Sequence, residues 1–345
     1  MPSLHHYSRK SPTRRNGDVC AHGALSGGKV AFRKKLSRDK VLPFLAEQPR
    51  SLVAMEACGS AHHWGRAIRN LGHEVRLIPP VYVKPFVKRQ KNDAADAEAI
   101  AEAASRPTMR SVAIKTEEQQ ALSMLFRTRD MFVRQRTQLI NALRGHLAEH
   151  GVVAAQGAAK VAELEKVVED PTTKLPLLVI ELAREHIEQI AALSEKIERL
   201  EKVVRREAGR EATARRLRTM SGVGPITAMA ILAFAPPLEE FRRGRDFAAW
   251  LGLVPRQHST GGKQCLGRTS KMGQRDIRTL LIIGAMAMVR WARRRGAPEG
   301  SWLARMLMRK PPMLVAIALA NKMARGVWAM MTRQEDYRVP ATVAT

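Results

Sequence analysis

The feature that most constrains this fold is a heptad pattern of packing residues between positions 183 and 204. Their spacing alternates strictly between three and four residues, through Ala183, His186, Ile190, Leu193, Ile197, Leu200 and Val204. A helix carries such residues along one side, and that side has to be covered by another helix. We expect His186 to be a packed residue of this seam and not a metal ligand. The sequence alone allows two partners, an earlier helix of the same chain or the same segment of a second copy.

A long helix is also expected over residues 117–150, before the heptad segment. Its apolar residues recur at helical spacing with arginines among them: Leu122, Leu125, Phe132, Leu139 and Leu143, with Arg129 and Arg136. The two helices together predict a long helical coiled-coil arm, closed either within one chain or between two copies.

The segment before this arm alternates between strand-like and helix-like patterns. Short strands are expected at residues 30–33, 51–56 and 74–78, and helices at residues 39–47, 62–71 and 93–104, with further helical signals through Val87. Such alternation is typical of an α/β layer domain with a largely parallel sheet. In that architecture, catalytic groups collect at the carboxyl ends of the strands.

The charge of the chain restricts its partners. Lys and Arg number 59 against 32 Asp and Glu, which gives a formal net charge of +27. The surplus is spread along the whole sequence, and such a charge favours a polyanionic partner. Hydrophobic residues make up 45% of the chain, which implies extensive packed structure and argues against a short or low-complexity ribosomal or chromatin protein. We therefore expect a nucleic-acid-binding protein with two or three domains.

Cysteine usage and hydropathy restrict the compartment. Cys20, Cys58 and Cys265 lie far apart and form neither a disulfide framework nor a zinc-ligand spacing. The most apolar segment, residues 313–331, is interrupted by polar and basic residues and suits a buried or amphipathic helix. The first residues carry no apolar signal core. We expect no membrane span and no secretion, but a protein of the bacterial cytoplasm that works at the nucleoid.

Three acids of the α/β domain are candidates for a metal site. Glu56 ends an apolar strand, and Asp93 and Asp96 stand three residues apart at a helix start, so both face one side. Converging carboxylates repel one another unless a cation neutralises them. Hard oxygen ligands suit magnesium or manganese, ions that polarise a phosphodiester. The alternative is that Asp93 or Asn92 only caps the helix and Asp96 is a surface charge.

A glycine-containing turn, MSGVGPIT, precedes an apolar helix at residues 220–227. Gly222 and Gly224 would leave backbone N–H groups bare at the helix N-terminus, and that arrangement can hold a DNA phosphate in a helix-hairpin-helix element. The alternative is a tight turn between two helices. The chain from Phe241 onward is mostly helical in pattern, so we expect an α-helical C-terminal domain with this helix-hairpin-helix-like turn.

A second candidate for chemistry is the loop GLVPRQHSTGGK and the basic stretch that follows it. Ser259 and Thr260 precede two glycines, so a phosphate can approach their hydroxyls closely. The nearby cations Lys263, Lys271 and Arg278 would offset the charge of a phosphoryl transition state. No P-loop pattern is present. The alternative is a loop that contacts phosphate without catalysis.

Taken together, these stretches resemble the DEDD-type insertion-sequence transposases, the family numbered one hundred and ten, and the related Piv DNA invertases. The resemblance covers roughly residues 24–331. Its most specific segments are MEACGSAHHWGR, KRQKNDAADAEAIAEAASRP, FRTRDMFVRQRTQLINALRGHLAEHG, SGVGPITA and WLGLVPRQHSTGGKQCLGRTSKMGQRDIRTLLIIGA.

The resemblance implies four parts. These are an atypical basic segment at residues 1–23, a RuvC-like (RNase H-like) domain at 24–115, the coiled-coil arm at 116–210 and a C-terminal transposase domain with the serine loop at 211–335.

The resemblance also implies roles for single residues. Glu56, Asp93 and Asp96 match the second, third and fourth metal-binding acids of the family, which use magnesium or manganese. Ser259 best matches the nucleophile, with Thr260 as the neighbouring hydroxyl. The implied partners are DNA and a structured guide RNA, and we expect a homo-oligomer formed through the arm.

The N-terminus departs from the family pattern. A first acid is expected on a strand resembling GIDLAK, and counting back from Val30 leads to Thr13, in a polar and basic segment broken by proline. Asp18 is out of register with that position. We interpret the segment as the product of a frameshift upstream of about Ala24. The first strand and its acid are then expected to be missing, and the sheet edge beside Val30 to be unpaired.

Three hypotheses for function follow. The first is a transposase whose serine forms a covalent link to DNA, assisted by metal bound to the acids. The second is a metal-dependent junction nuclease that uses water as the nucleophile. The third is a non-catalytic nucleic-acid-binding remnant, because the first acid is missing.

Overall fold

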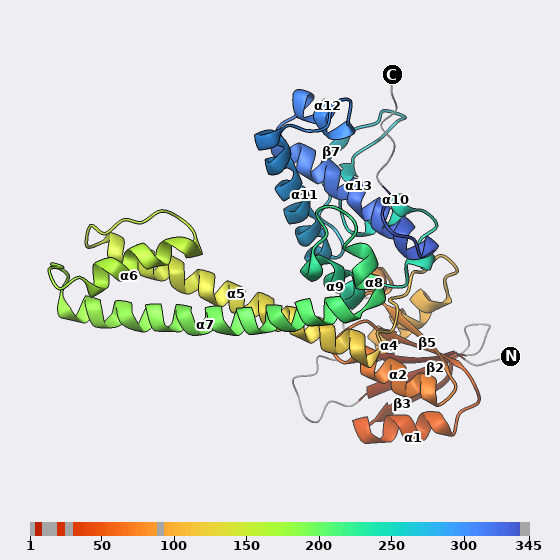
Figure 1. Ribbon diagram of the computed structural model, residues 1–345. Coiled ribbons are helices and arrows are strands. Elements are labelled where there is room, and N and C mark those ends of the chain that lie inside the picture. Colours follow the sequence, from red (N-terminus) through yellow and green to blue (C-terminus); the bar gives the residue numbers. More distant parts are fainter. Residues whose placement is uncertain (1–3, 9–18, 25–29, 88–92, 339–345) are drawn as a thin grey trace. The chain divides into compact units, whose positions relative to one another are not determined.

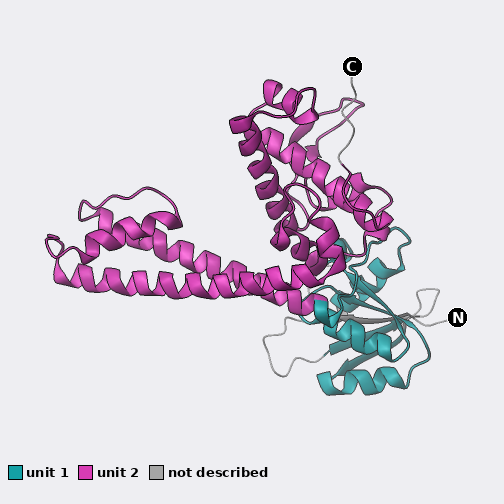
Figure 2. Cartoon of the chain, in the orientation of Figure 1, with its two compact units in different colours: residues 1–118 teal, residues 119–345 magenta. Residues whose placement is uncertain are grey.

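The computed structural model describes residues 4–8, 19–24, 30–87 and 93–338, and the chain divides into two compact units (Figure 2). Unit 1 comprises residues 1–118 and unit 2 comprises residues 119–345. Each unit has hydrophobic clusters of its own.

Unit 1 is built on a five-stranded mixed sheet in the order β3-β2-β1-β4-β5 (Figure 1). Its strands are β1 (Leu4–Ser8), β2 (Val19–Ala24), β3 (Val30–Leu36), β4 (Leu52–Glu56) and β5 (Glu74–Ile78). β1, β4 and β5 are parallel, whereas β2 is antiparallel to both β1 and β3. The expectation of a largely parallel sheet is therefore wrong for one half. The connections at 9–18 and 25–29 are too short for the crossover that a parallel neighbour needs.

The prediction that the first strand is missing is also wrong. β1 pairs with β2 and β4, and Val30 of β3 pairs with Ala24 of β2, so the sheet edge beside Val30 is occupied. β1 precedes the polar segment at which the expected strand was sought. Its backbone joins the sheet because the ladder is made by main-chain N–H and C=O groups, whatever the side chains are. Thr13 and Asp18 lie outside the described residues.

Helices cover both faces of this sheet. The turn η1 (Arg38–Lys40), α1 (Val41–Ala46) and α2 (Ala61–Asn70) lie on the face where Val53 and Met55 of β4 are buried. α3 (Pro80–Val83), η2 (Lys84–Phe86) and α4 (Asp93–Ser105) lie on the face where Ala54 is buried. Successive residues of β4 thus point to opposite faces, as the pleat of a strand requires.

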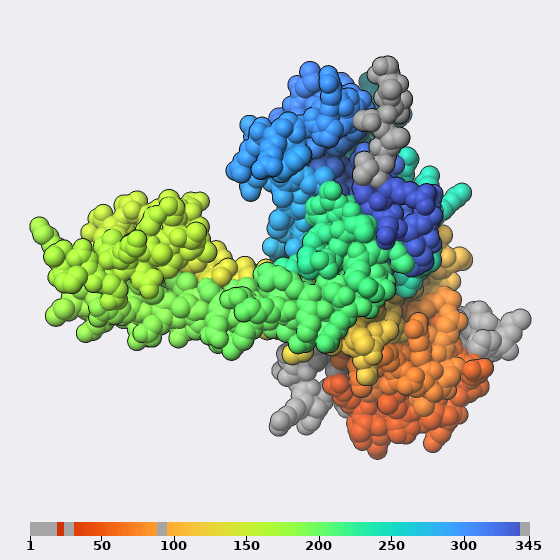
Figure 3. Space-filling model, viewed as in Figure 1, coloured from red at the N-terminus to blue at the C-terminus, as the bar shows by residue number. Residues whose placement is uncertain are grey.

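Unit 2 contains a helical arm formed by α5 (Glu117–Ala148), which starts at the unit boundary, η3 (Ala158–Lys160), α6 (Val161–Glu169) and α7 (Leu177–Arg210). α5 and α7 run side by side, and α6 packs near the end of the arm (Figure 1). In the space-filling view the arm is the long yellow and green projection of this unit (Figure 3).

The heptad seam of α7 is buried inside the chain. Ala183 and Ile190 pack in one cluster with Leu143 of α5 and Leu164 of α6. In this structure the seam is therefore covered by earlier helices of the same chain, the first of the two alternatives. His186 is half-buried and its ring lies 5.9 Å from that of His146, so it is a packed residue as expected.

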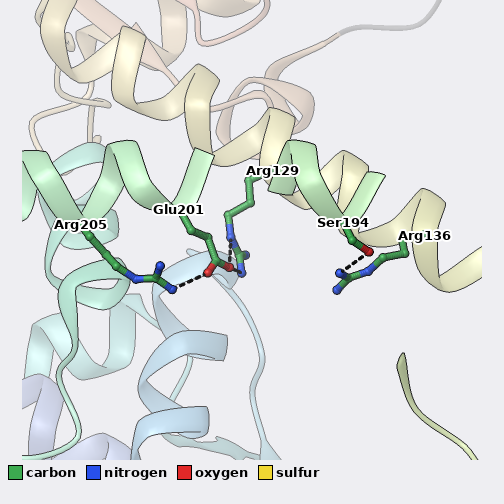
Figure 4. Close-up of polar contacts among 5 residues, drawn as sticks. All are labelled: Arg129, Arg136, Ser194, Glu201 and Arg205. Atoms are coloured by element: carbon green, nitrogen blue, oxygen red, sulfur yellow. Dashed lines mark hydrogen bonds and ion pairs between the residues drawn. The ribbon is translucent and has the colours of Figure 1, made fainter. Parts of the chain in front are cut away.

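Polar contacts between α5 and α7 fix the register of the arm (Figure 4). Arg129 of α5 donates from Nε to Oε1 of Glu201 of α7 at 3.0 Å, and Arg205, one turn further along α7, donates to Oε2 of the same carboxylate at 2.8 Å. Further along, Arg136 donates to the hydroxyl of Ser194 at 3.1 Å. Because the Arg129 and Glu201 side chains are largely shielded from solvent, this ion pair is screened less than a surface pair.

The rest of unit 2 is mostly helical, as expected. It contains α8 (Ala212–Leu217), α9 (Pro225–Phe234), η4 (Leu238–Glu240), α10 (Gly244–Trp250), β6 (Pro255–Gln257), β7 (Leu266–Thr269), α11 (Arg275–Arg295), α12 (Trp302–Arg309) and α13 (Pro312–Arg333). Its core is formed mainly by the apolar sides of α9, α11 and α13.

Among the described residues, α13 alone is long and apolar enough to cross a membrane by length and composition. It packs against α10 and α11. One side of it, which includes Val315, Leu319 and Val327, is buried in the core of unit 2. The expectation of a buried or amphipathic helix is confirmed for this segment.

Candidate functional site

Ser259 and Thr260 lie at the exposed end of a β-hairpin formed by β6 and β7. Gly261 and Gly262 have φ of +56° and +77°, and the Lys263 N–H donates to the Thr260 carbonyl at 3.1 Å. Two successive positive φ values favour glycine at both turn positions and match the strand twist of a two-residue hairpin. The Cys265 N–H donates to Ser259 Oγ at 3.3 Å. The two hydroxyls are thus presented to solvent on an ordered backbone.

Two glycines bring the ends of this hairpin segment into close contact. A Cβ on Gly252 would lie 2.0 Å from the Met272 carbonyl oxygen, and one on Gly273 would lie 1.8 Å from that of Trp250. Both glycines have positive φ, at +73° and +81°. The Lys271 N–H also donates to the Gly252 carbonyl at 3.2 Å. Any side chain at these two positions would push the two backbone segments apart.

Arg278 stabilises this backbone contact through two hydrogen bonds. Its Nη1 donates to the Leu251 carbonyl at 2.8 Å and to the Met272 carbonyl at 3.1 Å. The residue is 8% exposed, and burial, with a contribution from Arg275, lowers the pKa of its guanidinium. Lys263 and Lys271, in contrast, are exposed. The three cations grouped in the sequence analysis therefore differ, because Arg278 faces carbonyl groups of the interior and the two lysines face solvent.

The turn between α8 and α9 combines both geometries considered for it. Gly222 has φ of +83°, and its carbonyl oxygen would lie 2.0 Å from a Cβ on Gly284 of α11, so the turn packs tightly on that helix. Gly224 is exposed at the N-cap of α9, where no side chain caps the helix, and Pro225 follows. The N-terminus of α9 is therefore open to a ligand, as a phosphate-binding turn requires.

The candidate acids belong to β4 and α4 of unit 1. Glu56 is the last residue of β4 and pairs with Ile78, and the alternation of β4 places it on the same face as Ala54, which α4 covers. Asp96 is half-buried in the first turns of α4. Asp93 begins this helix, and its side chain lies outside the described part of the structure. A joint site of the three acids stays a prediction.

No group of three metal-ligating side chains is found among the described residues. β1, the neighbour of β4, reads LHHYS and carries no carboxylate. The ladder between the two strands ends at the pair of Tyr7 and Met55, and Ser8 and Glu56 are the residues that follow this pair on β1 and β4. The described residues therefore do not fit a complete metal site.

His22 belongs to this face of the sheet but was not singled out from the sequence. It lies on β2, is 4% exposed, and is paired in the ladder with Arg33 of β3. The pKa of His22 is lowered, mainly by burial and further by the positive charge of Arg33, whereas the negative charge of Glu98 raises it. Arg33 forms an ion pair with Glu98 of α4 at 3.5 Å. A histidine between apolar strand residues gave no signal of its own.

Comparisons with known proteins cover both units. Residues 214–298 match the model of the transposase IS116/IS110/IS902 family, and residues 14–151 match a model for DEDD transposases of IS110 elements. A probable family 20 transposase of Pseudomonas aeruginosa is 49% identical over 92% of this chain and 94% of its own. The transposase for insertion sequence element IS1328 of Yersinia enterocolitica is 41% identical over 89% of this chain and 91% of its own. That for IS1111A of Coxiella burnetii is 39% identical over 91% and 86%.

Proposed function

The chain belongs to the transposase IS116/IS110/IS902 family, and from this we propose that it cuts and rejoins DNA through the hydroxyl of Ser259. The observation that carries the proposal is the hairpin of β6 and β7. It presents two hydroxyls at an exposed turn, with Lys263 beside them and a rigid contact of two glycines and Arg278 beneath. A nucleophile in an exposed, ordered turn can be approached by a phosphodiester from solvent.

In the proposed step, Ser259 Oγ attacks phosphorus and the P–O bond to one deoxyribose breaks. The serine proton passes to the leaving oxygen, which departs as a hydroxyl. Because one phosphodiester replaces another, the bond energy is kept, and a DNA hydroxyl can reverse the step on a new strand without ATP. Lys263 and Lys271 would offset the charge that develops on the phosphoryl oxygens, and Arg278 would position the hairpin.

The sheet topology of unit 1 supports our proposal that this unit is a RuvC-like domain. Its mixed sheet, with a central β1 antiparallel to β2 and parallel to β4, agrees with that fold. We assign Glu56, Asp93 and Asp96 to the acidic site that the family uses for magnesium or manganese. The described residues do not complete such a site, so no step above passes through a metal.

DNA binding would rest on the distributed positive charge and on the turn of Gly222 and Gly224. The exposed N-terminus of α9 can accept a backbone phosphate, while Gly222 keeps the turn seated on α11. A structured guide RNA and a homo-oligomer remain part of the proposal on the family resemblance. Since the arm seam is covered within the chain, an oligomer would need another surface of the arm.

The test is covalent capture of DNA. Duplexes carrying the ends of the element and a 5′ or 3′ label are incubated with the protein, and adducts are resolved under denaturing conditions. The missing acid is supplied by replacing β1, residues 4–8, with a family strand of the GIDLAK type, so that its absence does not mask the result. Ser259→Ala should abolish the adduct while DNA binding stays nearly unchanged.

Thr260→Ala is the matched control, since it removes the neighbouring hydroxyl of the same turn. It should form the adduct at a reduced level at most. Loss with Thr260→Ala and retention with Ser259→Ala would assign the nucleophile to Thr260. No adduct in any version, together with metal-dependent cleavage, would instead favour the junction nuclease.

One observation favours a second function, that of a non-catalytic nucleic-acid-binding protein. β1 has no carboxylate in its sequence, so the acidic site lacks a contribution from the strand beside Glu56. In that case the unmodified chain would bind DNA and neither cleave nor capture it, whereas the version with the family strand would do both.

A further inference from the structure

A groove of about 1050 Å³ lies beside the base of the β6–β7 hairpin, lined by β7, α12 and α13. This volume is at the upper limit of small-molecule sites, so the groove can hold a segment of a polymer. It is placed by contacts within unit 2, because Asn321 of α13 donates from Nδ2 to the carbonyl of Leu253 at 3.2 Å. The same residue, Leu253, precedes the hairpin that carries Ser259.

The charge of the groove is positive throughout. Its lining includes four cations, Arg268, Lys271, Lys322 and Arg325, and no Asp or Glu. All four are exposed, and within the described part of the chain none of them takes part in an ion pair. Unpaired cations on the walls of one groove favour a polyanion as its occupant.

The walls also carry aromatic and apolar surface. Trp302 of α12 and Tyr337 line the groove, and Lys322 lies over the Trp302 ring, 5.2 Å from its centroid. Leu314, 48% exposed, adds an apolar side chain. Cations that follow a backbone, combined with aromatic and apolar surface for bases, are the features of single-strand binding sites. Duplex DNA would offer the cations its phosphates but would hide its base faces from Trp302 and Tyr337.

We propose that this groove binds a single-stranded stretch of the DNA that the hairpin acts on, with phosphates at Lys322 and Arg325 and a base against Trp302. The proposal rests on the proposed function, because it takes the hairpin as the place of cleavage. Arg268 is three residues beyond Cys265, which adjoins Ser259, so the groove begins about 10 Å from the hydroxyl along β7. That length corresponds to about three nucleotides of a stacked strand. Strand opening near the cut would therefore be stabilised by the groove.

Binding of a fluorescein-labelled thymidine oligonucleotide of about 12 nucleotides to the full chain tests the proposal, measured by anisotropy at several salt concentrations. The variant Lys322→Gln with Arg325→Gln removes two groove cations. If each contacts a phosphate, the log–log salt slope falls by about 1.4 and affinity at about 0.1 M salt falls by about 25-fold. Arg293→Gln with Arg294→Gln removes the same charge from exposed positions of α11 outside the groove and should cost less than about 3-fold.

Trp302→Leu separates stacking from charge. It should weaken binding of the oligonucleotide by about 5-fold or more and leave the salt slope unchanged, while binding of a duplex of the same length changes little. Thermal unfolding of each variant identifies any loss of binding that comes from misfolding. If Trp302→Leu unfolds, the variant Lys322→Gln with Arg325→Gln tests the proposal in its place.

Three results would overturn the proposal. These are equal effects of the groove pair and the α11 pair, equal losses for single strand and duplex, and losses confined to an RNA oligonucleotide of the same sequence. The DNA adduct at Ser259 is scored in parallel. An adduct that forms normally in groove variants with unchanged binding removes the groove proposal alone. Absence of the adduct from the parent, with binding lost in the groove variants, removes the proposed chemistry and keeps the groove.

Discussion

Arg278→Met should destabilise unit 2 and disable the serine hairpin without changing Ser259. Methionine keeps an unbranched apolar stem but has no guanidinium to donate to the carbonyls of Leu251 and Met272, which lie 2.8 and 3.1 Å from Nη1. Leu251 is 0% exposed, so its carbonyl would lose this partner with no access to water. The contact between Gly252 and Met272 would then be held by main-chain hydrogen bonds alone.

The size of the effect follows from these two carbonyls. A buried acceptor that loses its partner costs about 1–3 kcal/mol, and the partly solvated Met272 carbonyl adds less. Against this, the variant no longer buries a charged group, and burial already lowers the pKa of this guanidinium. We expect a net loss of about 2–3 kcal/mol in the free energy of unfolding. For a unit of this size that lowers the melting temperature by about 4–12 °C.

Thermal and urea unfolding of the full chain measure this loss, and DNA capture by the hairpin measures its consequence. Arg275→Met is the control, because Arg275 is an exposed residue of the same helical turn and should change stability by less than about 0.5 kcal/mol. Arg278→Lys should lie between the two, since an ammonium can still reach one carbonyl. An Arg278→Met variant as stable as the control, with normal capture, would refute the positioning role assigned to Arg278.

Four further predictions concern other parts of the chain. Gly284→Ala should destabilise unit 2 by about 2–4 kcal/mol in thermal unfolding, because its Cβ would lie 2.0 Å from a backbone oxygen, whereas Gly145→Ala, which meets nothing within 4 Å, should stabilise α5 by about 0.5–1 kcal/mol. Unit 1 should be most stable above pH 6.5 and should lose stability as the pH falls from there toward the lowered pKa of His22, because in that range the unfolded state binds more protons than the folded state. His22→Gln should flatten this pH profile in urea titrations, and an unchanged profile would exclude His22 as its cause. Duplex DNA affinity should fall with salt with a log–log slope of roughly five or more if about six phosphates are contacted, and a flat response would contradict nucleic-acid binding. Ser8→Asp, at the β1 position next to Glu56, should raise DNA cleavage or capture over the parent chain, and Ser8→Asn, which has no charge, should not.

Patterns with a strong period predicted their elements well. The strand at residues 74–78 has the predicted bounds, and the helix expected at 62–71 is observed as Ala61–Asn70. Both alternate or repeat apolar residues against a core, and burial of those residues determines the element. The heptad seam likewise predicted α7, but the choice of its partner depends on how the chain folds back, which spacing within one helix does not encode.

The strands β6 and β7 were not predicted, because their side chains do not alternate between buried and exposed positions. β6 is exposed at every residue and β7 at all but its last, so they show no alternation, and only the pair Gly261 and Gly262 marks the hairpin. Arg278 was expected to face a phosphate because it is charged. Its spacing of three residues to Leu281 and seven to Ala285, both buried, indicates the core side of α11, and that signal would have placed it correctly.

The N-terminal strand separates two requirements that one family motif normally meets together. Pairing in the sheet needs only backbone groups, and β1 supplies them with the sequence LHHYS. An acidic site for a hard cation needs a carboxylate at one register position, and the position next to Glu56 is Ser8. A cation left with fewer carboxylates keeps more water and a less fixed place, and a displacement of about 1 Å can cost about 100-fold in rate. We therefore expect unit 1 to fold and the chain to bind DNA through its basic surface, while the proposed step that depends on the acids is slowed. Folding alone would then be no measure of activity in this chain.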